Sequence, residues 1–170
     1  MRSANRNAVR IAREERTSRR EDEANALMRA TYARSLSTLN VLAVASMDFS
    51  RPKRMMLSVD IPGKELQEEF DAALAKCSAA EMSAHNAAAE IDLIAPSQMC
   101  ELEAETHDKA TTCEKRTQGE FLLARSKLRI AMRSHLQGLD IPEYSELSEL
   151  AKDELRTKAS FPSGEHILGR

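Results

Sequence analysis

A seam of mostly small apolar residues constrains this chain more than any other feature. Between residues 66 and 94, apolar positions recur at spacings of four and three in strict alternation. The seam consists of Leu66, Phe70, Ala73, Cys77, Ala80, Ala84, Ala87, Ile91 and Ile94. This spacing keeps one stripe of a helix facing a partner helix along its whole length. Because most of the seam is Ala or Cys, a partner helix can approach closely, but each turn buries little apolar area.

Proline and glycine mark where the helices are expected to end. Neither residue occurs between positions 4 and 47, which predicts a long N-terminal helix within residues 1–50 and a linker over 51–62. The second half of this helix carries its own stripe at the same spacing. That stripe consists of Met28, Tyr32, Ser35, Leu39, Leu42, Ser46 and Phe49.

A central antiparallel hairpin over residues 63–138 is the main architectural prediction. Its helices are expected at about 63–94 and 97–137, separated by a break at Ala95 and Pro96. Folding the chain at this break brings Cys77 opposite Cys113 and Phe70 opposite Phe121. The residues expected at the helix–helix interface are Leu66, Phe70, Cys77, Ile91, Met99, Cys113, Phe121 and Leu128.

The rest of the chain completes an all-α prediction. A short helix is expected over 140–159, followed by a tail over 160–170. The third helix would extend past the second and expose Leu128, Ile130, Ala131 and Met132. The N-terminal helix, the short C-terminal helix or neighbouring subunits would then have to complete the bundle.

Composition agrees with long helices rather than one compact core. The chain has 170 residues, no Trp, four Phe and two Tyr, and 31% of its residues are charged. Three cysteines, an odd number, favour free thiols in a reducing compartment, either the cytoplasm or the interior of a virus particle. The apolar run Val41–Ala45 is far shorter than the roughly 18 residues that a transmembrane helix needs.

Arginine dominates the start of the chain. Residues 1–20 hold seven Arg, two Glu and no Lys. One broad helical face carries Arg2, Arg6, Arg10, Arg13, Arg16 and Arg20. Guanidinium groups suit phosphates and carboxylates, so this face predicts contact with nucleic acid, anionic lipid or an acidic protein. The plainer interpretation is a solvated face that pairs with Glu14 and Glu15. No aromatic residue precedes Tyr32, so the face lacks a platform for stacking bases.

No pattern in the chain indicates catalysis, a metal or a cofactor. The cysteines and histidines match no zinc-ligand spacing, and seam cysteines are explained as small apolar residues. The many carboxylates lie on predicted helix faces without a neighbouring glycine-rich loop or aromatic wall. We therefore expect a protein that is not an enzyme and has no metal or cofactor.

The sequence as a whole favours a structural subunit that works in several copies. Its partners would be protein subunits, in a homo-oligomer, a hetero-assembly or both. A virion component (phage internal core, head or tail) and a cellular scaffold are both suitable settings. One alternative is a nucleic-acid-binding or packaging accessory that uses the Arg face. The other is a helical adaptor or secretion-type chaperone that grips partner helices.

Overall fold

The computed structural model describes residues 2–160, and it confirms the all-α prediction. This segment forms α1 (Arg2–Leu57), α2 (Lys64–Asp92), α3 (Ser97–Thr111), α4 (Gln118–Leu136) and α5 (Tyr144–Ser160). The side chains of residues 2–10, 12 and 160 lie outside the description, as do residue 1 and residues 161–170. The predicted tail over 160–170 therefore falls almost entirely outside the described residues.

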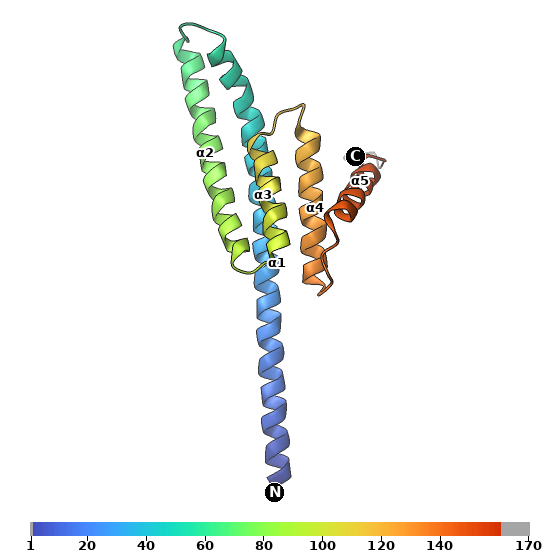
Figure 1. The fold of residues 1–170 in the computed structure, drawn as a ribbon. Coiled ribbons are helices and arrows are strands. Elements are labelled where there is room, and N and C mark those ends of the chain that lie inside the picture. The colour runs from blue at the N-terminus through green and yellow to red at the C-terminus, as the bar shows by residue number, and fades with distance from the viewer. Residues whose placement is uncertain (1, 161–170) are drawn as a thin grey trace, which may run out of the picture.

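The helices form an elongated bundle from which one helix projects (Figure 1). The upper part of α1 and all of α2 form an antiparallel hairpin. Beside it, α3 and α4 run up and down, and α5 lies on the outer side of α4. The N-terminal part of α1 continues beyond the bundle as a single helix.

The seam of α2 faces inward, but its main partner is α1 rather than the helix that follows it. The α1–α2 contact is the most extensive in the bundle. Arg34 Nη1 donates to both Glu90 carboxylate oxygens at 2.5 and 2.8 Å. Farther along, the Phe49 and Phe70 ring centroids lie 5.3 Å apart. Both helices carry a seven-residue repeat, which lets their stripes stay in contact over many turns.

The predicted α2–α3 hairpin is present only near its turn. His85 and His107 lie close, with ring centroids 5.1 Å apart, and Ile91 and Met99 are fully buried. The register expected at this end agrees with that contact. Farther from the turn the prediction is wrong, because α3 ends at Thr111 and α2 does not pack against α4. Phe70 therefore meets Phe49 instead of Phe121, and the Cys77 Sγ atom lies 3.8 Å from Ser46 Oγ on α1.

Threonine side chains bond the backbone on both sides of the break in the predicted helix over 97–137. The Thr111 and Thr112 hydroxyls donate to the His107 and Asp108 carbonyls at 3.0 and 2.9 Å. The backbone N–H of Glu114 donates to the Thr117 hydroxyl at 2.9 Å. Side chains that bond the local backbone in this way compete with helical hydrogen bonds, and β-branched residues are weak helix formers.

The break reverses the direction of the chain, and this reversal buries residues that the sequence predicted to be exposed. Because α4 folds back into the bundle, Leu128, Ala131 and Met132 are buried and Ile130 is half-buried. The prediction that these four residues would be exposed is wrong. The α4 helix packs on α1, α3 and α5, so of the predicted ways to complete the bundle, the N-terminal and C-terminal helices are the ones that cover it here.

Proline 52 does not end the first helix. The helix continues to Leu57, so the connection to α2 covers residues 58–63 rather than 51–62. Pro52 is itself buried, and the adjacent ring contact between Phe49 and Phe70 holds this part of α1 on α2. Tertiary packing thus offsets the hydrogen bond that a proline inside a helix removes.

A glycine cap ends α4 at the last connection. Gly138 has φ of +68°, and the N–H of Leu139 donates to the Ser134 carbonyl at 3.0 Å. A left-handed glycine with this bond closes a helix in the Schellman arrangement. The final helix begins at Tyr144 rather than at 140, and its Leu147 and Ala151 are fully buried.

Candidate interaction surfaces

The projecting part of α1, residues 2–30, is called the arm. Every described side chain from Ile11 to Ala30 is exposed except that of Met28, which is half-buried. Figure 1 shows no other helix beside this segment. The bundle begins at Thr31 and Tyr32, the first buried side chains of α1. Among its described residues, 11 and 13–30, the arm therefore presents side chains to solvent around the helix.

Polar residues surround the arm. Arg13, Arg16 and Arg20 are exposed, as the sequence analysis expected of an Arg face. Arg2, Arg6 and Arg10 have helical backbones, but their side chains lie outside the described residues. Continuing the apolar stripe of α1 toward the N-terminus meets four polar residues, Asn25, Glu21, Ser18 and Glu14, before the exposed Ile11. The arm thus lacks an apolar seam, and a partner would have to recognise charge.

Charge is divided unequally between the tip of the arm and the rest of the chain. Seven Arg and two Glu give residues 1–20 a formal charge of +5. Since the whole chain carries −2, residues 21–170 carry −7. The molecule therefore has a basic tip and an acidic body, which a nearly neutral total conceals.

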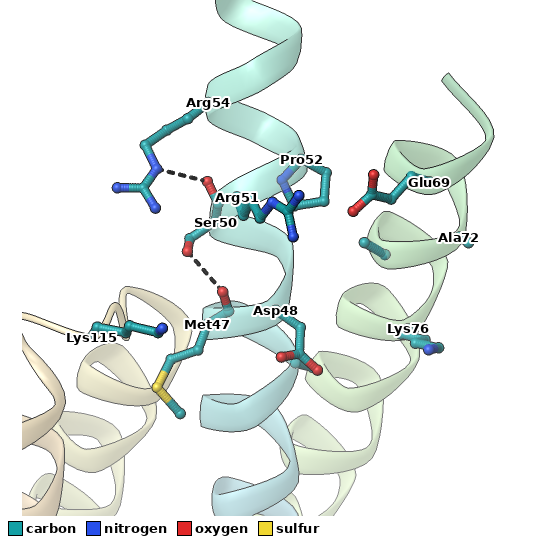
Figure 2. Close-up of a pocket in the computed structure, with 12 residues that line it drawn as sticks. Met47, Asp48, Ser50, Arg51, Pro52, Arg54, Glu69, Ala72, Lys76 and Lys115 are labelled. Carbon is teal, nitrogen blue, oxygen red and sulfur yellow. Dashed lines mark hydrogen bonds between the residues drawn. The ribbon is translucent and has the colours of Figure 1, made fainter. Parts of the chain in front are cut away.

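A cleft of 540 Å³ lies at the far end of the bundle, between the last turns of α1, the first half of α2 and Lys115 (Figure 2). Figure 2 shows Asp48 and Arg51 on α1 and Glu69 on α2 along the space between these helices. The Ser50 hydroxyl donates to the Met47 carbonyl at 2.7 Å. The basic residues that line the cleft are Arg51, Arg54, Lys76 and Lys115, all of them exposed. Exposed charges of both signs are well screened, so this cleft has weak selectivity for an anion.

A buried lysine joins three helices, and sequence reasoning missed it. Lys127 on α4 is 3% exposed, and its Nζ atom donates to Glu105 on α3 at 2.7 Å. The same Nζ atom lies 2.6 Å from the Tyr144 hydroxyl and 4.0 Å from the Tyr144 ring centroid. The ion pair therefore joins α4 to α3, and the Tyr144 contact adds α5, so the role of Lys127 is structural. The apolar residues at positions 124, 128 and 131 were the sequence signal that could have indicated that Lys127 is buried.

The cysteines and histidines do not converge on a metal site. All three cysteines are free thiols, and burial raises the pKa of Cys113. His85 Nδ1 lies 3.4 Å from His107 Nε2, and burial together with His85 lowers the pKa of His107. Among residues 2–160, no group of three His, Cys, Asp or Glu side chains is placed to hold a metal ion.

The predicted interface residues lie on the inner faces of the helices, though not all in the predicted pairs. Ile91, Met99, Cys113, Phe121 and Leu128 are buried. Leu66, Phe70 and Cys77 are half-buried along the α1–α2 contact. The stripes thus identified inward faces, while the choice of partner depended on the break at 112–117.

The described helices include none with the length and apolar character that crossing a membrane requires. Comparison of the chain with protein-family models, curated proteins and solved structures finds no match.

Proposed function

We propose that this protein is a non-enzymatic assembly subunit that joins protein partners through its arm. The observation that carries the proposal is the exposure of the arm on all described sides. A helix without a packed face gains little stability from its own length, so a protein partner would stabilise it. Multi-copy particles such as virions and cellular scaffolds are the kind of assembly that such a subunit builds.

An acidic protein surface is the partner that the arm fits best. Arg13, Arg16 and Arg20 offer forked donors for carboxylates, and the body of the protein itself carries the complementary charge. Nucleic acid is the second candidate, which the Arg face favours. The lack of any aromatic residue before Tyr32 argues against single-strand binding, but not against contact with duplex phosphates.

Sedimentation velocity of the full chain, from 1 to about 200 µM in 50 mM NaCl, tests the proposal. We expect the mass to increase with concentration, and the increase to be lost in the triple variant Arg13→Gln, Arg16→Gln, Arg20→Gln. Glutamine keeps helix propensity while removing the charge. The matched control removes three exposed arginines of the body, Arg116, Arg133 and Arg156, and should assemble normally.

A monomer at every concentration would overturn self-assembly. If that monomer bound a 30-base-pair duplex with a steep salt dependence that the arm variant lost, the nucleic-acid alternative would be correct. A monomer that ignored the duplex would point instead to the adaptor alternative.

A further inference from the structure

A groove of 550 Å³ separates α2 from α3 on the outer side of their contact. Ala88, Ala89 and Ala104 line it, and such small side chains allow another helix to lie close. Four carboxylates line the same groove, those of Glu81, Asp92, Glu103 and Asp108. No Lys or Arg is among the described residues that line it. The groove therefore combines small side chains that a helix could approach with four carboxyl groups, beside the imidazoles of His85 and His107.

Glu103 shows that the groove lacks a cation. This side chain is 5% exposed, and its buried Oε1 atom has no hydrogen-bond partner among the described residues. Burial, and then the charge of Asp92, raise the pKa of Glu103 to about 7. A buried carboxyl oxygen without a donor is unfavourable, so such groups are normally paired. A guanidinium group in the groove would place a positive charge beside this carboxyl group.

We propose that the α2–α3 groove receives the arm of a second copy of this chain, with an arginine directed toward Glu103. This inference rests on the proposed function and names the partner surface. The second copy is the occupant because the basic tip and acidic body are complementary in sign. The arm of the same copy cannot bend back, since it continues α1 without interruption and leaves the bundle lengthwise (Figure 1).

When two copies lie antiparallel, the arginines of one arm reach the same level along the helix axis as the carboxylates of the other copy's groove. The contact of Arg34 with Glu90 puts Asp92 about level with Tyr32 along α1. When Arg20 of one arm lies level with Asp92 of the other copy, Arg10, Arg13 and Arg16 follow toward Glu81, because both helices rise about 1.5 Å per residue.

The same alignment brings the C-terminal parts of the two arms to the same level. By the two-fold symmetry, Glu23 of each arm comes level with Arg29 of the other. The two copies would thus exchange identical contacts, which produces a closed dimer rather than a fibre.

Charge reversal with mixing tests the pairing. The arm-reversed variant carries Arg13→Glu, Arg16→Glu and Arg20→Glu, and the groove-reversed variant carries Glu81→Lys, Asp92→Lys and Asp108→Lys. Each alone should dimerise at least about tenfold more weakly than the wild type, because like charges then face each other. An equimolar mixture should form heterodimers, since an acidic arm then meets a basic groove and a basic arm meets an acidic groove. Far-UV circular dichroism verifies that both variants fold.

A matched control reverses three exposed carboxylates away from the groove, Glu65, Glu143 and Glu146, to Lys and should dimerise like the wild type. Glu103→Gln, which leaves the groove's shape intact, should weaken the dimer severalfold. If the groove-reversed variant dimerises normally while the arm-reversed variant does not, the inference is wrong and the proposed function stands. The arm-reversed and groove-reversed variants could each be monomeric and still form no heterodimer when mixed. That result would also show that the groove does not bind the arm. A wild type that is monomeric throughout overturns both.

Discussion

Glu103 is a carboxyl group held where its charge is disfavoured. Its pKa of about 7 in the folded chain compares with 4.5 for an unperturbed glutamate. Between these values the folded state holds the proton more tightly than the unfolded state does. Stability therefore falls as pH rises from about 4.5 through 7, and the full contribution of protonated Glu103 is present only below that window. The negative charge of Asp92 on α2 raises the pKa of Glu103 further.

The variant Glu103→Gln should remove this pH dependence. We expect it to be more stable than its parent by on the order of 2–3 kcal/mol at pH 8, with the difference nearly gone at pH 4.5. Urea unfolding in the arm-reversed background measures this without a contribution from association. Glu101→Gln, an exposed neighbour on α3, is the control and should change stability little at either pH. A gain for Glu103→Gln that is equal at both pH values would contradict the burial argument.

Lys127 makes the opposite kind of contribution, since its charge is paired inside the protein. A double-mutant cycle with Lys127→Met and Glu105→Gln should give a coupling free energy of about 1–2 kcal/mol, because the half-buried Glu105 keeps part of its hydration. Chemical unfolding of the two single variants and the double variant measures it. Independent, additive effects would show that the ion pair does not stabilise the contact between α3 and α4.

Helix α4 depends on one aromatic side chain at its start. Phe121 is 4% exposed in the first turn, directly after the break that returns the chain to the bundle. Phe121→Ala should lower the free energy of unfolding by about 3–5 kcal/mol through lost burial and the cavity left behind. Leu122→Ala, at the exposed adjacent position, should cost about 1 kcal/mol or less. Equal losses in the two variants would contradict the placement of α4.

The inward faces of the helices could be predicted from sequence, whereas the break and the pairing could not. The stripe from Tyr32 through Ser46 on α1 and the stripe from Ala80 to Ile91 on α2 both proved to be inward-facing, since hydrophobic spacing reports periodicity directly. The end of α3 falls at Thr111 and Thr112, whose hydroxyls bond the local backbone as that of Thr106 also does inside the helix, so these residues do not announce a break. Pro52 predicted an end of the first helix that the structure does not have, because tertiary packing outweighs the local effect of this proline.

The candidate site was predictable in part for the same reason. The Arg face of the arm follows from sequence spacing alone. The acidic groove does not, because Asp92 and Glu103 meet only through the α2–α3 packing, and Glu103 becomes unusual only when it is buried. Lys127 similarly needs α5 in place before it has partners from two helices.

At the scale of the whole molecule, separated charge makes association sensitive to salt. Residues 1–20 and 21–170 have formal charges of +5 and −7, so copies attract through opposite parts. Raising NaCl from 50 to 500 mM shortens the screening length from about 14 to about 4 Å and should weaken the dimer at least about tenfold. Analytical ultracentrifugation at fixed protein concentration follows this. Association that strengthened with salt would indicate an apolar interface and contradict the charge argument.

The single helix α1 should open locally at two different rates, fast in the arm and slow within the bundle. Backbone amides of α1 beyond Tyr32 are enclosed by the bundle, while those of the arm depend on helical bonds alone. Deuterium should replace the arm's amide protons far faster than those around Leu39 and Leu42, with the rate changing near Thr31 although the helix itself has no break there. Docking of the arm on another copy would slow its exchange toward that of the bundle. The boundary between fast and slow amides would then move toward the N-terminus as protein concentration rises.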